Sequence, residues 1–590
     1  MIVKMKKLTL LLGLKDRDST LKTLRKLGVL HIQDIKTPVS EDIQSLETKL
    51  ENVNKALQII SEHDNKQADA DVERAPDYVE QILSLTQQKD VLNRELSEHK
   101  EIYRWYQKWG DISYASLQKL KQAGVFVRLY ITDKNAVKTI ADDKTIHIEK
   151  EEHGAVYLAL FAESSEERLD LKEDHVPQVE LVDVKSKISQ AENEINNINN
   201  SVKDLSQFRN SLLDYQKDLE KRLQLNRVKY GMGHEGQLVY LQGFCPEDSV
   251  PQIKKTAEKD GWGYLVQDPD EPNEVPTLMR NPKWLRIIEP LFDFMGTLPG
   301  YHELDVSFVF LAFFSVFFAM LVGDGGYGLV FLICTFLLSR KFKDGPREFI
   351  NLMYVLSVMT VVWGLITGNW FGLETFAKLP LLSMFIVPQL DTFREISTDV
   401  VMQLSFIIGV IQLSIGHLLS AVKKMNSITA LAEIGWVVVL WGVFFVANNL
   451  VLGKPLPDIT IPLLITGIVI IAVFANFQKN ILKGILLSLG NLPLDIISSF
   501  SDIVSYIRLF AVGFASFIVA ASFNSMAIGS GIDSVVSGII AAIILFLGHA
   551  LNIALCGMAV LVHGVRLNML EFSGHVGVQW TGKPYKPFKE

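Results

Sequence analysis

Arg508 stands at a place in the sequence where a charge is costly. It lies near the middle of residues 488–528, an apolar stretch long enough to cross a lipid bilayer. A guanidinium stays protonated at physiological pH, and placing one at the centre of a membrane helix costs roughly 2.5–3.5 kcal/mol. With about 15 residues of helix on either side, on the order of 20 Å, the side chain cannot reach water. We therefore expect Arg508 to face protein or a water-filled cavity, in ion transport or in a buried structural ion pair.

Three carboxylates in the same half of the chain are candidates to act with this arginine. Asp495 and Asp502 precede it in the same apolar stretch, and Glu433 lies early in another one. Asp502 would lie about 9 Å from Arg508 along a straight helix, too far for a direct pair. An acid in a hydrated channel can pass protons or small cations, or it can simply neutralise a nearby arginine.

The last apolar segment carries a polar stripe. Residues spaced 3, 4, 3, 4 and 3 apart share one face of an α-helix, and here they are His549, Asn552, Cys556, Ala559, His563 and Arg566. Ionisable side chains rarely face lipid, so the stripe predicts a hydrated path or a helix–helix seam. Each histidine alone could also be a packing residue. Glu571 follows Arg566 by five residues and is a further candidate acid.

The elements that must position these residues are helices. We predict eight membrane spans, at about 305–322, 326–339, 350–368, 399–421, 429–451, 461–476, 492–528 and 535–570. The last two exceed the roughly 20 residues that a perpendicular helix needs, so they should be strongly tilted or extend beyond the bilayer. Asp324, in the turn between the first two, is expected to be a structural cap. Lysines and arginines gather in one set of loops, which predicts that both termini are cytoplasmic.

The first half of the chain contains no apolar run near 18 residues and reads as a cytoplasmic arm, residues 1–285, before a membrane domain at 286–590. Heptad seams at 41–111 and 180–229 predict an antiparallel coiled-coil hairpin, with a homodimeric coiled coil as the alternative. The second seam contains two successive steps of three between 202 and 208, which predicts local overwinding.

Two small α/β lobes complete the predicted arm. A distal lobe, 112–179, should contain strands at 124–132 and 155–162 with short helices between and after them. A membrane-proximal lobe should form where residues 1–40, read as strand, helix and strand, meet residues 230–275. The fold class is thus an α-helical membrane protein preceded by a coiled-coil arm with two α/β lobes.

Composition excludes several function classes. The 590 residues carry a formal charge of −8, which gives no sign of nucleic-acid binding. Three cysteines match no metal spacing and fit a reduced, cytosol-facing protein. The sequence has no GxxxxGK[ST] loop, so we expect no nucleotide site, cofactor, metal or catalytic residue in this chain.

Four blocks resemble a known family. SYIRLFAVGFA (505–515) and HGVRLNMLEF (563–572) resemble the two arginine blocks of the membrane stator subunit of vacuolar/archaeal-type rotary ATPases, subunit a or I. FAMLVGDGGYG (318–328) and WGLITGNWFG (363–372) resemble two further blocks. The resemblance implies that Arg508 is the essential stator arginine, Arg566 the second arginine and Glu571 the acid of its block. Cys556 and Ala559 stand where some members carry an acid and a serine, so the half-channel acid is open and Asp495 is a candidate.

The resemblance also implies partners and a mechanism. The partners would be the lipid bilayer, a proteolipid c-ring, peripheral stalk subunits E and G, a central-stalk socket subunit and, through the stalks, the catalytic ATPase head, in a prokaryotic cell membrane. Arg508 would displace H⁺ or Na⁺ from ring carboxylates, and the working direction stays open. The alternative is a stand-alone secondary ion transporter with a cytoplasmic coiled-coil regulatory domain, which predicts an internal repeat among the spans.

Overall fold

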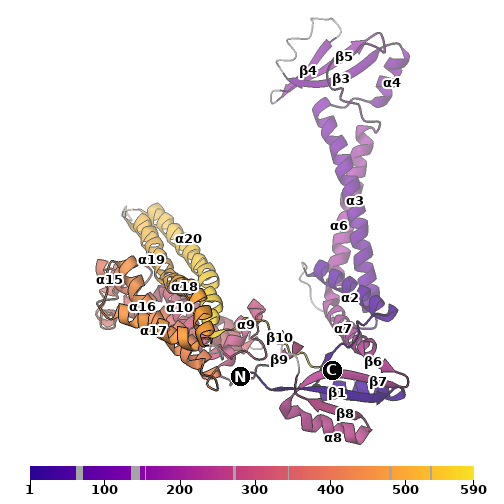
Figure 1. Ribbon diagram of the computed structural model, residues 1–590. Coiled ribbons are helices and arrows are strands. Elements are labelled where there is room, and N and C mark those ends of the chain that lie inside the picture. Colours follow the sequence, from indigo (N-terminus) through magenta and orange to yellow (C-terminus); the bar gives the residue numbers. More distant parts are fainter. Residues whose placement is uncertain are drawn as a thin grey trace. The chain divides into compact units, whose positions relative to one another are not determined.

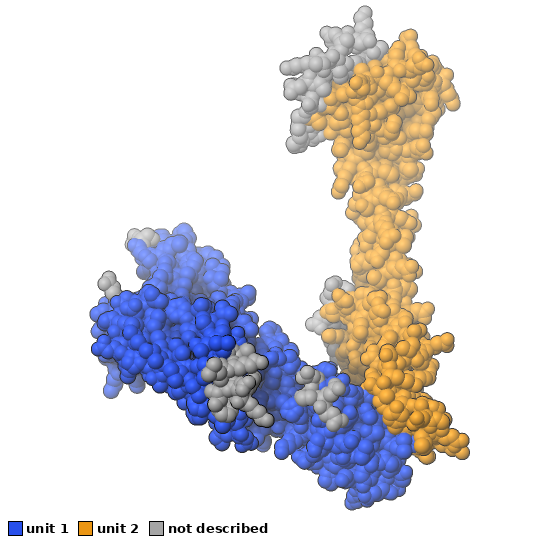
Figure 2. All heavy atoms as spheres, viewed as in Figure 1, with its two compact units in different colours: residues 1–12, 23–33, 241–589 blue, residues 13–22, 34–240, 590 orange. Residues whose placement is uncertain are grey.

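The computed structural model describes residues 1–61, 71–133, 146–152, 155–269, 274–342, 345–476, 481–529, 531 and 534–589 (Figure 1). Parts of the predicted arm, residues 62–70, 134–145 and 270–273, lie outside this range. Contacts divide the chain into two compact units (Figure 2): residues 1–12, 23–33 and 241–589, and residues 13–22, 34–240 and 590. Each unit combines several stretches of chain, and the arm and membrane-domain bounds stay a prediction.

The second unit is built on helices α2 (Glu41–Ile60), α3 (Ala75–Trp109), α6 (Leu181–Leu205) and α7 (Arg209–Gly231). Helices α3 and α6 lie side by side (Figure 1), and α2 packs on α7. The α3–α6 pair is antiparallel, because Lys100 pairs with Glu192 at 2.7 Å while Ile82 packs in one core with Val202. The predicted overwinding is a 3₁₀ helix, Ser206–Phe208, which has about three residues per turn. A role as coiled-coil arm stays a prediction.

The same unit contains a three-stranded antiparallel sheet beside helix α4 (Tyr114–Gln122). Its order is β3 (Phe126–Asp133), β5 (Ala155–Ala162) and β4 (Ile146–Glu152), and β4 was missed from sequence. The helix expected after β5 is wrong, since residues 163–180 contain none. Tertiary bonds hold that segment instead: Arg128 pairs with Glu173 at 2.9 Å, and the Trp109 indole donates to Asp174 at 2.8 Å.

The first unit contains the sheet predicted from the two separated stretches. Its order is β2 (His31–Gln33), β7 (Leu238–Pro246), β1 (Met5–Gly13) and β8 (Gly263–Gln267), with α1 (Arg17–Leu27) and α8 (Val250–Asp260) as its helices. Leu8 faces Val266 and His31 faces Phe244 in antiparallel register, so strands of the two stretches pair in one sheet. The bounds of a membrane-proximal lobe stay a prediction. Burial raises the pKa of the Cys245 thiol to about 11, so it stays protonated.

Smaller elements complete the chain. A short strand, β6 (Gly233–Glu235), pairs with the start of β7, and β9 (Pro276–Thr277) pairs in parallel with β10 (Lys583–Pro584). Three short helices lie around the membrane segments, α9 (Glu289–Met295), α13 (Glu374–Ala377) and α14 (Pro380–Ser383).

All eight predicted membrane segments are helical. They form α10 (Ser307–Val322), α11 (Gly325–Lys341), α12 (Arg347–Thr367), α15 (Glu395–Lys423), α16 (Ala430–Leu452), α17 (Thr460–Phe474), α18 (Ile481–Ser505), α19 (Ile507–Ile528) and α20 (Val535–Ala559). Among the described residues, five spans are long and apolar enough to cross a membrane, and α10 with α11, bent by 119°, would add a sixth. Helix α17 is shorter, so the count of eight stays a prediction.

The last two spans, Ser488–Ile528 and Val535–Val576, are as long as expected, at 41 and 42 residues, but their helical geometry is not regular throughout. Tyr506 separates α18 from α19. After Ala559 the last span continues as two π-helical segments, Val560–Gly564 and Leu567–Phe572, before the short α21 (Ser573–Val576). A π-helix bonds residue i to i+5, so the α-helical spacing that defined the polar stripe ends at Ala559.

Asp324 caps α11, as predicted. Its Oδ1 accepts hydrogen bonds from the backbone N–H groups of Gly326 at 2.7 Å, Tyr327 at 3.2 Å and Phe371 at 2.9 Å. The residue is 1% exposed, so water cannot replace this acceptor. One carboxylate therefore joins the α10–α11 turn to the loop after α12.

Replacing Asp324 with alanine should destabilise the membrane half by about 2 kcal/mol or more, because a cap is lost and buried N–H groups lose their acceptor. Thermal unfolding of the purified chain in detergent measures this. Asp458→Ala, at an exposed aspartate before α17, is the matched control and should leave the transition in place. Equal transitions for the two variants would contradict the capping role.

Candidate functional site

Arg508 is paired with an acid of the last span. Its Nη2 donates to Glu571 Oε1 at 2.5 Å, and its Nε donates to the Ser505 carbonyl at 2.8 Å. The Arg508 side chain is 20% exposed and that of Glu571 is 4% exposed. Arg508 thus faces protein, as the cost of a lipid-exposed charge predicts, and the break at Tyr506 supplies a carbonyl for it.

The π-helical segment brings Arg566 to the same carboxylate. Arg566 Nε lies 3.6 Å from Glu571 Oε1. In an α-helix, residues five apart point about 140° away from each other. In a π-helix they are one turn apart, which is why these two meet. One buried carboxylate therefore serves two arginines, and the triad of Arg508, Glu571 and Arg566 keeps a surplus positive charge.

A buried chain of neutral side chains positions this triad. The Tyr506 hydroxyl donates to Gln412 Oε1 at 2.8 Å, Gln412 Nε2 donates to Asn568 Oδ1 at 2.8 Å, and Asn568 Nδ2 donates to the Gly564 carbonyl at 3.2 Å. Tyr506, Gln412 and Asn568 are fully buried. They connect the break before Arg508 to the segment that holds Glu571. None of the three was predicted from the sequence, although the two amide side chains inside apolar spans were a usable signal.

An open polar cavity of about 570 Å³, which we call the acid-lined cavity, lies beside the triad. All four candidate acids of the sequence analysis line it. Its lining includes Asp495, Asp502, Glu433, Glu571, Arg566, Lys424, His417 and His575. Asp495 is exposed on its wall. Asp502 Oδ2 bonds His575 Nε2 at 3.0 Å rather than Arg508. Glu433 bonds His417 Nδ1 at 2.7 Å and pairs with Lys424.

His549 and Asn552 belong to a different network, between α11, α19 and α20. His549 bonds the Tyr327 hydroxyl through Nδ1 at 2.8 Å and Asn524 Oδ1 through Nε2 at 3.1 Å. Asn552 Nδ2 donates to the Tyr327 hydroxyl and to the Ser516 carbonyl, both at 2.9 Å. This network contains no carboxylate, and its members satisfy one another.

His563 joins neither group. It lies in the first π-helical segment, half-buried, and its Nδ1 has no hydrogen-bond partner among the described residues. The predicted stripe is therefore divided, because the change to π-helical geometry turns His563 and Arg566 away from the line of His549 and Asn552.

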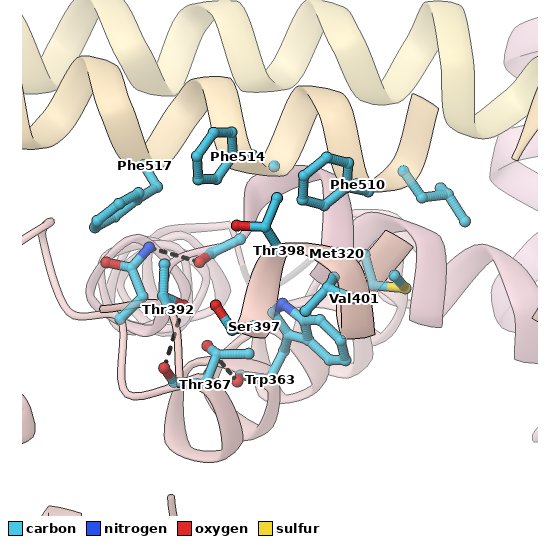
Figure 3. A pocket seen from close by; sticks show the side chains of 14 residues that line it. Met320, Trp363, Thr367, Thr392, Ser397, Thr398, Val401, Phe510, Phe514 and Phe517 are labelled. Atoms are coloured by element: carbon cyan, nitrogen blue, oxygen red, sulfur yellow. Dashed lines mark hydrogen bonds between the residues drawn. The ribbon is translucent and has the colours of Figure 1, made fainter. Parts of the chain in front are cut away.

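A second, smaller cavity of about 50 Å³ lies against α19 (Figure 3). Figure 3 shows Phe510, Phe514 and Phe517 in a row above the hydroxyl groups of Thr392 and Ser397. It has room for water molecules, but no titratable side chain lines it. Charge therefore concentrates at the acid-lined cavity.

No family model matches the chain. The chain is 31% identical to V-type ATP synthase subunit I of Borreliella burgdorferi, over the full length of both proteins. This chain belongs to the family of V-type ATP synthase subunit I. It is 28% identical to subunit I 1 of Treponema pallidum, again over both full lengths. It is 26% identical to the A-type subunit I of Methanocaldococcus jannaschii, over 72% of this chain and 66% of that one.

Membership of the subunit I family confirms the resemblance found in the four sequence blocks. It makes the chain a membrane subunit of a rotary ATP synthase, a complex that couples ATP to ion transport. The spans described above are the part of this subunit I member that can cross the membrane.

A double-mutant cycle should detect the interaction between Arg508 and Glu571 in this subunit I member. Arg508→Ala and Glu571→Ala should each lower thermal stability in detergent, because each removes the closest charged partner of the other residue. The double variant should lose less stability than the two single variants lose together, with a coupling free energy of about 0.5–3 kcal/mol. The cycle of Arg508→Ala with Asp495→Ala is the control and should be additive. Additivity in both cycles would contradict the pairing.

Proposed function

We propose that this chain is the non-catalytic, ion-translocating stator of a V/A-type rotary ATPase/ATP synthase, and that Arg508 displaces H⁺ or Na⁺ from carboxylates of a rotating proteolipid ring. One observation carries the proposal: a triad with surplus positive charge lies in the membrane segments, directly beside an acid-lined cavity. A structural ion pair alone would need no cavity and no second arginine.

The charges explain how the ion is released. A ring carboxylate that faces lipid must be neutral, with a proton or a cation bound, because its bare charge is costly there. When it arrives beside Arg508 and Arg566, the surplus positive charge favours its ionised form. Glu571 cannot cancel both arginines, and its Oε2 is buried without a partner among the described residues, so it can accept one more donor. The released ion then enters the acid-lined cavity.

The surface of α19 supports a sliding contact. In line with Arg508, at spacings of 3 and 4, lie exposed residues that are mostly small: Ala511, Ala515, Ile518, Ser522 and Ser525. Gly513, on the buried face, packs so closely that an added Cβ would lie 2.3 Å from the Met320 carbonyl oxygen. Small residues thus serve close helix packing on one face and leave a smooth surface on the other. Arg566 is 55% exposed, and a ring subunit or cavity water would cover it.

Two offset paths would connect this surface to the two sides of the membrane. Lys424, at the end of α15, lines the acid-lined cavity, and the distribution of lysines and arginines assigns that end to the cytoplasm. The network of Tyr327, His549, Asn552 and Asn524 would border the outer path. Asp495, Asp502, Glu433 and Glu571 would then belong to the inner path, with His563 between the two.

The N-terminal half would link the membrane part to the rest of the complex. The helix pair α3–α6 would bind peripheral stalk subunits E and G, and through them the catalytic head. The membrane-proximal lobe would contact the central-stalk socket subunit. The stand-alone transporter remains the alternative, and it predicts that the purified chain transports ions in liposomes without other subunits.

Arg508→Ala should abolish ATP-driven ion pumping and ATP synthesis in the reconstituted complex, because Glu571 then cancels Arg566 and no surplus positive charge remains to ionise the ring carboxylate. Native gel electrophoresis should show an assembled complex, since Arg566 still lies beside Glu571. Arg394→Ala, at an exposed loop arginine, is the control and should pump normally. Retained pumping by Arg508→Ala would overturn the proposed function.

Asp495→Asn should slow pumping several-fold and leave thermal stability unchanged, because this exposed cavity aspartate supplies charge rather than packing. Initial rates of ATP-driven transport and unfolding in detergent measure the two effects. Asp458→Asn serves as the control. Wild-type rates for Asp495→Asn would remove this residue from the path.

A further inference from the structure

Two histidines join two carboxylates of the acid-lined cavity in one continuous hydrogen-bonded chain. Glu433 Oε2 lies 2.7 Å from His417 Nδ1, His417 Nε2 lies 2.8 Å from His575 Nδ1, and His575 Nε2 lies 3.0 Å from Asp502 Oδ2. The four residues come from α16, α15, α21 and α18. Neither histidine was selected from sequence, and the family comparisons assign neither of them a role.

Burial, stacking and hydrogen bonds hold the four side chains of this hydrogen-bonded chain in place. The His417 side chain is 8% exposed and that of His575 is 11% exposed. The Trp436 ring stacks on His417, with 5.9 Å between ring centroids and 12° between their planes. Lys424 pairs with the second oxygen of Glu433, so both oxygens of that carboxylate hold N–H donors.

The three contacts of this hydrogen-bonded chain need one proton more than two ionised carboxylates and two neutral imidazoles supply. Each of its three contacts needs one hydrogen between the two heavy atoms. Ionised carboxylates supply none, and two neutral imidazoles supply one each, so one contact would lack a hydrogen. All three distances are hydrogen-bond distances. All three contacts are hydrogen bonds only when one more proton resides on an imidazole or on one of the two carboxylates.

The charges around the chain favour that proton. With it, the charges of Glu433, Asp502 and Lys424 sum to zero. Without it, the group is negative, and Asp495 on the same cavity wall adds a further negative charge. The other charged groups that line the cavity are Arg566 and Glu571, which lie against each other at 3.6 Å. The protonated chain is the electrically balanced state.

We propose that Glu433, His417, His575 and Asp502 form a proton relay, and that the ion carried through this cavity is H⁺. This inference rests on the proposed stator function and adds the identity of the ion. When Asp502 carries the additional proton, its O–H donates to His575 Nε2, His575 Nδ1–H donates to His417 Nε2, and His417 Nδ1–H donates to Glu433. In the transfer, each of these three protons moves along its hydrogen bond from the donor to the acceptor.

This transfer balances. Asp502 loses a proton, Glu433 gains one, and both imidazoles stay neutral with the opposite nitrogen protonated. Glu433 gives its proton to water beside Lys424, whose positive charge favours the ionised acid. The starting tautomers return when each ring gives its Nε2 proton to cavity water and takes one from water at Nδ1, because both histidines line the cavity. Transfer in the opposite direction uses the same three contacts.

The geometry does not suit a metal cation. Hard cations are bound by several oxygen ligands, whereas the middle of this chain consists of ring nitrogens that already face each other. Among the described residues, no group of three or more histidine, cysteine, aspartate or glutamate side chains has the arrangement of a metal site. A relay of imidazoles carries protons and nothing larger.

The test uses the whole complex in proteoliposomes, with ATP-driven acidification and ²²Na⁺ uptake measured in parallel. Wild type should acidify and take up no Na⁺. His417→Gln and His575→Gln should lower acidification at least about tenfold, because glutamine keeps a hydrogen bond but cannot relay a proton. His302→Gln, at an exposed histidine before α10, is the control and should acidify at the wild-type rate. Native gels verify assembly.

Chemical rescue distinguishes a relay from a structural role. His575 lines the open cavity, so His575→Ala leaves space that added imidazole can enter. Acidification should recover with a series of substituted imidazoles in the order of their proton affinities, which a space-filling role would not produce. Rescue that is absent or independent of proton affinity, wild-type rates in the glutamine variants, or protonophore-resistant ²²Na⁺ uptake would each overturn the relay. If Arg508→Ala still blocks transport in those cases, the stator function stands.

Discussion

The membrane half depends on one constraint, that a guanidinium inside apolar segments must be neutralised and hydrogen-bonded within the protein. Removing an ion from water costs several kcal/mol, and only excellent geometry compensates for it. The contact between Arg508 and Glu571 meets this requirement at 2.5 Å. Its two residues lie beside the two places where the helices are irregular. The break at Tyr506 supplies the Ser505 carbonyl to Arg508, and the π-helical segment turns Glu571 and Arg566 toward each other.

Irregular helices in a membrane are costly unless their free backbone groups and polar side chains find partners. Here the chain Tyr506–Gln412–Asn568 runs between the two irregular places and is fully buried. Buried polar networks that are fully satisfied are rigid and specify one arrangement. The same network that makes the irregularities tolerable therefore fixes the distance between the arginine and its acid.

Much of this architecture could be predicted from the sequence because its signals are local. The cost of a charge in the middle of an apolar segment predicted that Arg508 faces protein. The length of the apolar segments predicted the helices, and the GDGG turn predicted that Asp324 is a cap. The partners of the charges could not be predicted this way. His417 and His575 are separated by 158 positions, and no periodicity relates them. The polar stripe assumed an α-helical period that the chain abandons after Ala559.

The position of Cys556 shows why the acids of this chain lie where they do. Its Sγ lies 3.2 Å from Ser516 Oγ, in the neutral network with Asn552 and Tyr327. An acid there would be buried among hydroxyl and amide groups with no cation beside it, and its charge would be costly. The acids of α16 and α18 instead have Lys424 and two histidines as partners, and an open cavity beside them. The neutral network can therefore hold α19 against α20, while the charged side chains gather around the open cavity.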